Sequence, residues 1–182
     1  MSCYLLKIEE NTLFARRGVA KLCPDADDTA DLYEQTVQTL EQAGFDQYEI
    51  SNFARRGYES RHNRKYWRCE EYLGIGPGAH SYLEGRRFSC PADLASFLSS
   101  PLSRKDEGPG GGLAEETMLR LRLKEGISKE DFAARFDKTA VEELFQRAQR
   151  FQKLGLMQRH KDRLFFTTQG FLVSNSVLAS LL

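Results

Sequence analysis

Residues 55–68 hold the densest group of side chains that could bind a ligand. Six basic residues stand there against one acid, with aromatic rings, a histidine and an asparagine between them. Guanidinium groups pair with carboxylates and phosphates through two parallel hydrogen bonds, flat rings stack on flat ligands, and histidine is a ready axial ligand of haem iron. The segment therefore suits a flat, polyanionic, iron-bearing ligand such as haem. The side chains concerned are Arg55, Arg56, Tyr58, Arg61, His62, Asn63, Arg64, Lys65, Tyr66, Trp67 and Arg68.

Two other interpretations of this segment stay open. Composition alone favours a solvated basic loop whose aromatic rings pack onto a neighbouring sheet. Single-stranded nucleic acid also binds between basic and aromatic side chains. The whole chain has 26 basic and 26 acidic side chains, so its net charge of zero weakens the nucleic-acid interpretation.

A glycine-rich segment and a carboxylate are further candidates. Residues 74–81 read Gly-Ile-Gly-Pro-Gly-Ala-His-Ser, and repeated glycines let a ligand approach the backbone closely. Pro77 interrupts the dinucleotide-binding spacing, and a tight turn in a crowded sheet explains the glycines equally well. Glu49 lies near the end of an apolar segment, where α/β folds place functional groups. A solvent-facing glutamate on an alternating strand is the alternative.

The cysteines and the overall composition exclude several classes of protein. Cys3, Cys23, Cys69 and Cys90 lack the close spacing of zinc or iron–sulfur ligands, so we expect four reduced thiols. Hydrophobic residues make up 41% and charged residues 29%, which is ordinary for a globular protein. No apolar run approaches the roughly 20 residues that span a bilayer, and the first ten residues do not form a signal peptide. We therefore expect a cytoplasmic protein.

The periodicity of the first part of the chain predicts an α/β fold. We expect a strand over residues 3–8, a helix over 25–42 and a strand over 45–50, an order typical of a parallel sheet. A strand at the very start suggests a domain cut in its middle. The further expected elements are a loop at 51–67, a strand at 71–75, strands around a turn within 82–89 and a helix at 91–98.

The second part of the chain has a different pattern. Residues 99–112 are rich in serine, proline and glycine, which predicts a linker and a domain boundary near residue 108. A helical region with a small hairpin follows, which is typical of a winged-helix-like unit. Residues 106–182 carry 12 basic and 11 acidic side chains, which favours packing on a neighbour over DNA binding. The expected elements are helices at 115–124, 129–136, 141–154 and 171–182 and a hairpin at 156–159 and 163–167.

Three separate motifs together resemble the HemW family, relatives of the oxygen-independent coproporphyrinogen III oxidase HemN. They are Tyr-Glu-Ile-Ser-Asn-Phe-Ala-Arg at 48–55, His-Asn-Arg-Lys-Tyr-Trp at 62–67, and Tyr-Leu followed by the glycine segment at 72–81. The H-N-x-x-Y-W pattern resembles the HemW branch, where it is associated with haem binding. The resemblance extends to residues 118–126 and 154–156 and so covers nearly the whole chain.

The resemblance implies a cytoplasmic radical-SAM protein. Its fold would be α/β, with residues 1–107 as the C-terminal part of an incomplete (β/α) barrel and 108–182 as a HemN-type, winged-helix-like α+β domain. The family binds S-adenosylmethionine and a [4Fe–4S] cluster through C-x3-C-x2-C, and it delivers haem to client haemoproteins such as respiratory enzymes. This sequence has no such motif, so we assign no cluster ligand and expect the missing N-terminal half to carry it.

Carried over residue by residue, the resemblance makes His62 the candidate ligand of the haem iron. Other residues of the same segment would shape the pocket, stack on the haem or pair with its propionates: Asn63, Tyr66, Trp67, Arg55, Arg61 and Arg64. A cofactor pocket would be lined by Glu49, Asn52, Gly74, Gly76 and Gly78. Two residues depart from the family, because Arg56 stands where proline is frequent and Arg64 where an apolar residue is common.

Three functional hypotheses follow. The first is a fragment of a haem chaperone, the second a fragment of a coproporphyrinogen III oxidase, and the third a nucleic-acid-binding module. The H-N-x-x-Y-W pattern favours the first. Radical chemistry needs the cluster, so we expect no such activity from this chain alone and name no catalytic residue. We also expect residues 113–182 to be the more stable unit, because half a barrel leaves an open sheet edge in residues 1–105.

Overall fold

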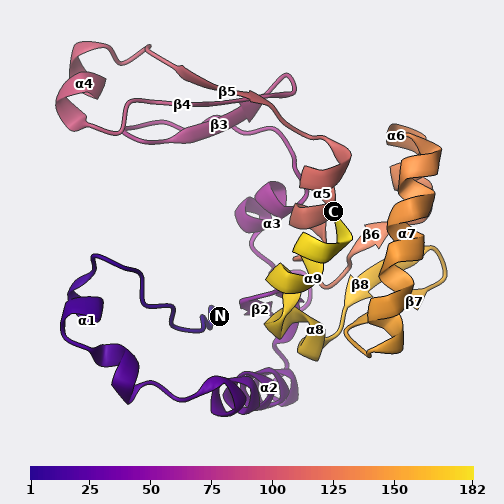
Figure 1. Cartoon of the computed structure of the whole chain (residues 1–182). Coiled ribbons are helices and arrows are strands. Elements are labelled where there is room, and N and C mark those ends of the chain that lie inside the picture. The colour runs from indigo at the N-terminus through magenta and orange to yellow at the C-terminus, as the bar shows by residue number, and fades with distance from the viewer.

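The N-terminal segment of the chain lies along the outside of the molecule. A computed structural model describes all 182 residues, and the segment is indigo in Figure 1. It contains the short helix α1 (Leu13–Arg16) and the 3-10 helix η1 (Val19–Leu22), neither of which buries a residue. The strand predicted at 3–8 is wrong, since the segment forms only an isolated bridge between Ser2 and Asn52. Residues 4–6 have no neighbouring strand to satisfy their backbone groups.

Helix α2 (Ala26–Gln42) confirms the helix predicted at 25–42. The Asp25 side chain accepts a hydrogen bond from the backbone N–H of Asp28, which caps the N-terminus. Tyr33, Val37 and Leu40 form its buried stripe at helical spacing.

Strands β1 (Asp46–Glu49) and β2 (Asn52–Ala54) follow α2 and form an antiparallel hairpin. The predicted strand at 45–50 is therefore present, but the predicted parallel pairing is wrong. The parallel partner predicted at 3–8 forms no strand, and β1 pairs instead with β2 through the two-residue connection Ile50–Ser51, which is too short for a parallel crossover.

Helix α3 (Arg61–Trp67) occupies much of the predicted loop at 51–67, so the loop prediction is wrong for these residues. The Ser60 hydroxyl accepts a hydrogen bond from the backbone N–H of Asn63 and caps the helix. The strand predicted at 71–75 is also wrong, because only Tyr72 makes an isolated bridge, to Tyr82.

A separate three-stranded antiparallel sheet follows α3. Strands β3 (His80–Leu83) and β4 (Arg86–Ser89) confirm the predicted hairpin, and β5 (Lys105–Pro109) pairs with β4. Helix α4 (Leu94–Ser99) begins after its cap Asp93, later than the predicted start at Pro91. The linker predicted at 99–112 is wrong for residues 105–109, which form the strand β5. This strand crosses residue 108, so a domain division at that residue stays a prediction.

The C-terminal part confirms the winged-helix-like prediction and adds a strand to it. Five helices, a short strand and a hairpin make up this part, and the sheet has the order β6-β8-β7. The helix predicted at 171–182 is instead two helices that meet at Val173. The elements are α5 (Leu113–Arg120), β6 (Ile127–Ser128), α6 (Lys129–Arg135), α7 (Lys138–Lys153), β7 (Met157–His160), β8 (Arg163–Phe166), α8 (Thr168–Leu172) and α9 (Ser174–Leu181).

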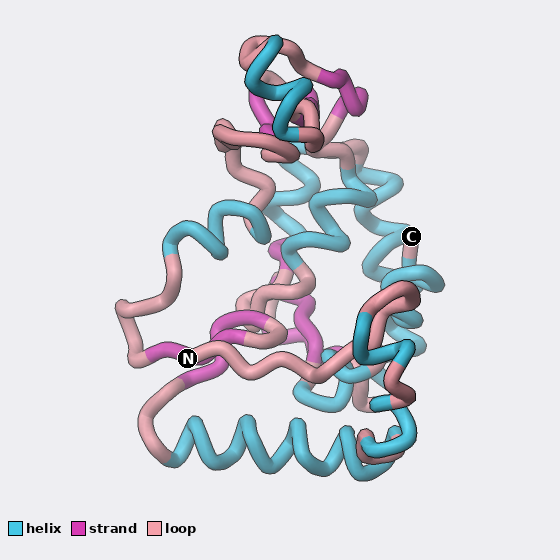
Figure 2. The backbone as a smooth tube through the Cα atoms, turned by 90° about the vertical axis from the view of Figure 1, so that its left-hand side faces the viewer, coloured by secondary structure: helices cyan, strands magenta, loops and turns pink.

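A single hydrophobic core joins the two parts of the chain. It contains 19 buried residues, and Tyr33, Val37 and Leu40 of α2 belong to it together with the buried face of the winged-helix unit. Helix α2 packs against α8, at the bottom of both overall views (Figures 1 and 2). The β3–β5 sheet and α4 project away from this core. No helix is both long enough and apolar enough to cross a bilayer.

Limited proteolysis is expected to cut first within residues 1–24. Helix α1 and η1 bury no side chain, so this segment opens at little cost in free energy. Intact-mass spectrometry over a time course would show these residues lost before any cut in α7, which buries five side chains. A resistant fragment that retains residue 1 while α7 is cut would contradict both this expectation and the greater stability predicted for 113–182.

Candidate functional site

Helix α3 carries the H-N-x-x-Y-W residues as two pairs, because residues four positions apart share a helix face. The first pair, His62 and Tyr66, is exposed. The Nε2 atom of His62 lies 3.0 Å from the Tyr66 hydroxyl oxygen, and the two rings meet edge to face at 4.7 Å. Tyr66 also meets Tyr72, with ring centroids 4.5 Å apart. This outer pair gives a ligand access to an imidazole supported by two aromatic rings.

The second pair, Asn63 and Trp67, is partly buried and faces the β1–β2 hairpin. The Asn63 side chain and the Ser60 backbone hydrogen-bond the Tyr48 hydroxyl, although burial has the larger effect and raises the pKa of Tyr48. The Trp67 side chain lies beside the Glu49 carboxylate. Trp67 therefore lies between α3 and the hairpin, and the stacking role expected of it stays a prediction.

Glu49 is a buried carboxylate, with 1% of the residue exposed, so the solvent-facing alternative is wrong. Burial is the main influence and raises the pKa of Glu49. Hydrogen bonds from the Asn52 amide, the Ser51 backbone and Trp67 oppose that rise. Asn52 also accepts a hydrogen bond of 2.5 Å from the Ser2 hydroxyl. Glu49 and Asn52, both predicted as site residues, are therefore in direct contact.

The predicted arginines divide into two groups. Arg64 is engaged by acids, with its guanidinium 3.1 Å from Glu125 and 3.7 Å from Glu59. Glu125 also accepts hydrogen bonds of 3.0 and 2.9 Å from Arg68. Arg55 and Arg61 are exposed. Of the three arginines expected to pair with propionates, these two have the accessible guanidinium groups.

A cleft of about 670 Å³ opens beside the inner face of α3. Small-molecule sites have volumes of about 300–1,000 Å³, so the cleft is large enough for a ligand. It brings together Asn52, Arg55 and Asn63 but is not lined by the outer pair or the glycine segment. Its lining residues are Met1, Ser2, Phe45, Tyr48, Asn52, Phe53, Ala54, Arg55, Tyr58, Ser60 and Asn63.

The glycine segment forms a turn that packs on itself. A Cβ atom at Gly74 would collide with the carbonyl oxygen of His80, and the Gly74 N–H donates to the Ser81 hydroxyl at 3.0 Å. This geometry supports the tight-turn interpretation at Gly74. Gly78 lines a different cleft, together with His80. The structure therefore does not bring Gly74, Gly76 and Gly78 together with Glu49 and Asn52, and their role in a cofactor pocket stays a prediction.

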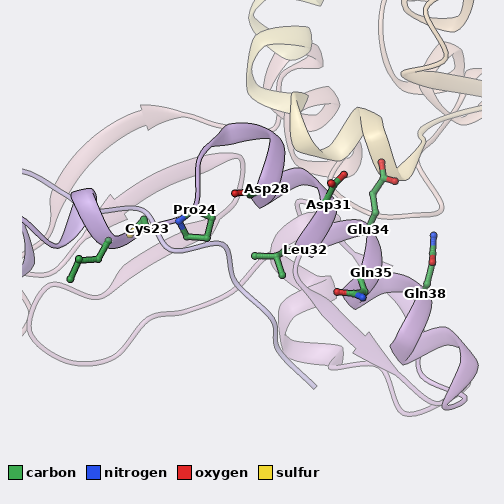
Figure 3. A pocket seen from close by; sticks show the side chains of 9 residues that line it. Cys23, Pro24, Asp28, Asp31, Leu32, Glu34, Gln35 and Gln38 are labelled. Carbon is green, nitrogen blue, oxygen red and sulfur yellow. The ribbon is translucent and has the colours of Figure 1, made fainter.

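A further cleft, of about 690 Å³, lies along α2. Figure 3 shows acidic and amide side chains projecting from successive turns of the helix, with Cys23 and Pro24 at one end. None of the predicted site residues lines it. No three histidine, cysteine, aspartate or glutamate side chains of the chain are grouped to hold a metal ion. The residues present therefore do not fit an iron–sulfur cluster.

Sequence reasoning missed three residues that shape the site. Tyr48 lies inside a recognised motif, so its position beside Glu49 was an available signal. Arg122, whose guanidinium carbon lies 6.0 Å from the centroid of the Trp67 ring, and Glu125, the partner of Arg64, lie within residues 118–126, but the resemblance of that segment gave no signal of a contact with α3. Both contact α3 across more than 50 positions of sequence, so only the tertiary structure reveals them.

The chain is similar to known proteins along its whole length. Residues 113–173 match the family model described as the HemN C-terminal domain. The haem chaperone HemW of Lactococcus lactis is 34% identical over 196 residues, which cover all of this chain and 50% of that protein. HemW of Bacillus subtilis is 34% identical over 192 residues, with the same coverage. HemW of Escherichia coli is 38% identical over 141 residues, 74% of this chain and 37% of that protein.

A solved structure shares the fold. It is the coproporphyrinogen III oxidase HemN of Escherichia coli, described as a radical SAM enzyme, with a TM-score of 0.59 and 14% sequence identity. The match covers 87% of this chain and 42% of that one. It confirms the expected fold class. The chain spans about half the length of the first curated relatives that it matches.

Proposed function

Because this chain is a HemW-like radical-SAM family sequence that carries a HemN C-terminal domain, we propose that it binds haem for delivery to other proteins. His62 supplies the iron ligand in this proposal. The recipients are client haemoproteins such as respiratory enzymes, and the protein itself acts in the cytoplasm. S-adenosylmethionine and the [4Fe–4S] cluster belong to the whole protein, and the cluster ligands lie outside these 182 residues.

The exposed outer pair on α3 is the observation that carries the proposal. An iron atom needs an unprotonated imidazole nitrogen and open space in front of it. His62 is exposed, and its contact with the Tyr66 hydroxyl restricts the ring without burying it. Arg55 and Arg61 are exposed and available to the propionates of a haem.

A haemin titration followed by absorbance tests the proposal. The wild type is expected to give a saturable Soret shift, and His62→Ala is expected to abolish it, because the variant lacks the iron ligand. His160→Ala is the matched control, since His160 is an exposed residue at the end of β7, and it should bind haemin as the wild type does. A saturable shift of equal affinity in His62→Ala would contradict the assigned ligand. A folded wild type without any shift would contradict haem binding.

Two assays separate the alternatives. Delivery predicts that the haem-loaded chain transfers haem to an apo-haemoprotein, visible as the absorbance spectrum of the recipient. The oxidase alternative predicts that the full-length protein, with its cluster, converts coproporphyrinogen III by oxidative decarboxylation at enzymatic rates. A nucleic-acid-binding module predicts salt-dependent binding to oligonucleotides, and an absence of binding at low salt would remove that alternative.

A further inference from the structure

The only tryptophan of the chain lies where three elements meet. Trp67 ends α3, its side chain lies beside the Glu49 carboxylate of β1, and the guanidinium carbon of Arg122 lies 6.0 Å from its ring centroid. A cation at this distance from an indole face is attracted by the ring. The ring is thus held between an anionic and a cationic side chain from segments far apart in the sequence.

The backbone of residues 122–124 fixes the position of Arg122 relative to the hairpin. The Ile50 N–H donates to the Arg122 carbonyl oxygen at 3.0 Å, and the Lys124 N–H donates to the Tyr48 carbonyl oxygen at 3.0 Å. Glu49 and Leu123 form an antiparallel bridge between these two hydrogen bonds. Residues 122–124 therefore extend the β1–β2 hairpin, and the winged-helix part reaches the base of α3 through them.

Glu125, the residue after this segment, contacts α3 at a second place. Glu125 accepts hydrogen bonds from Arg64 and Arg68, one helical turn apart on α3. These ion pairs are half-buried. Ion pairs that water still reaches contribute only about 0–1 kcal/mol each, so they orient the helix more than they stabilise it. The buried Glu49 carboxylate differs, because a buried charge is costly unless hydrogen bonds compensate it. The contact between Glu49 and Trp67 therefore depends on how α3, β1 and residues 122–124 are arranged.

We propose that Glu49 and Arg122 are positioning residues, which hold Trp67 between them and thereby orient the outer pair of α3 for haem. This inference rests on the proposed haem binding. His62 and Tyr66 lie on the exposed face of α3. The angle at which they face a ligand is therefore set by the contacts that Trp67 makes on the opposite face. The residues that support a metal ligand change metal affinity without touching the metal.

Trp67 fluorescence tests the positioning role without any haem. Glu49→Gln keeps the side-chain volume but removes the charge, and it is expected to shift the emission of Trp67 to longer wavelength and to raise its quenching by acrylamide, with unchanged far-UV circular dichroism. Arg122→Met is expected to change the emission and the quenching in the same way, because it removes the cation on the other side of the ring. It takes the place of Glu49→Gln if that variant does not fold. Glu70→Gln is the control, because Glu70 is exposed and close in sequence to α3. Wild-type emission and quenching in both variants would overturn the proposal.

Haemin affinity then tests the link to the ligand. In Glu49→Gln and Arg122→Met the haemin Kd is expected to rise about tenfold, the scale at which supporting residues act on metal sites. Altered Trp67 fluorescence with wild-type haemin affinity would assign Glu49 and Arg122 to the fold alone and overturn the proposal. If the folded wild type does not bind haemin, the proposed function fails, while the fluorescence result still decides whether Trp67 is held.

Discussion

Replacing Phe166 with alanine is expected to lower the free energy of unfolding by about 3–5 kcal/mol, the usual cost of removing a buried phenylalanine. Phe166 lies in β8 with no exposed surface, and its ring centroid is 5.7 Å from that of Phe171 in α8. The backbone of β8 also pairs with β6 and β7, so the surrounding core has little freedom to close around the cavity. The loss would affect the whole structure, because the core joins α2 to the winged-helix unit.

Equilibrium urea denaturation, followed by far-UV circular dichroism, measures this change. Phe14→Ala is the matched control, since Phe14 in α1 is 49% exposed and its truncation should change stability by less than about 0.5 kcal/mol. Equal midpoints for the two variants would show that Phe166 does not belong to a tightly packed core.

Gly170→Ala is expected to destabilise the protein by about 1–3 kcal/mol, the range for overpacking, or by more. A Cβ atom at Gly170 in α8 would collide with the carbonyl oxygen of Leu156. That oxygen already accepts hydrogen bonds from the backbone and the hydroxyl of Thr167, so it cannot move away without breaking them. Helix α8 would have to shift away from the hairpin.

Gly112→Ala is the control for this substitution. Gly112 has a φ of −72° as the cap of α5, and a Cβ there would have no atom within 4 Å. Thermal unfolding should therefore show a lower Tm than the wild type for Gly170→Ala. The Tm of Gly112→Ala should be almost the same as that of the wild type. A Tm for Gly170→Ala within about 1 °C of the wild type, against the roughly 2–4 °C expected for each kcal/mol, would refute the predicted collision.

The sequence was most informative where local signals agree with the tertiary structure. The helix at 25–42 has a capping aspartate and an apolar stripe, and both are present in α2. The strand expected at 3–8 failed because a strand also needs a partner, and no periodicity reveals whether one is present. The linker expected at 99–112 failed for the opposite reason. Lys105–Pro109 has the composition of a loop, yet it pairs with β4 across some 20 residues of sequence.

The candidate site was predictable as a set of residues but not as an arrangement. The motif at 62–67 was found by its pattern, but treating it as a loop hid the division of its residues between two faces of α3. The Ser60 cap was the available signal for that helix. Arg122 and Glu125 could not have been predicted, because the contacts that they make with α3 are formed only when the winged-helix part packs beside it.

The packing of α2 on α8 has a consequence for synthesis on the ribosome. Tyr33, Val37 and Leu40 emerge long before residues 168–172, which cover them in the finished protein. At about 5–20 residues per second, more than 120 residues of delay correspond to roughly 6–26 s. During that interval the apolar stripe of α2 has its contacts with β1, which follows α2 directly, but lacks its partner α8. The nascent chain therefore exposes apolar surface until residues 168–172 have been synthesised.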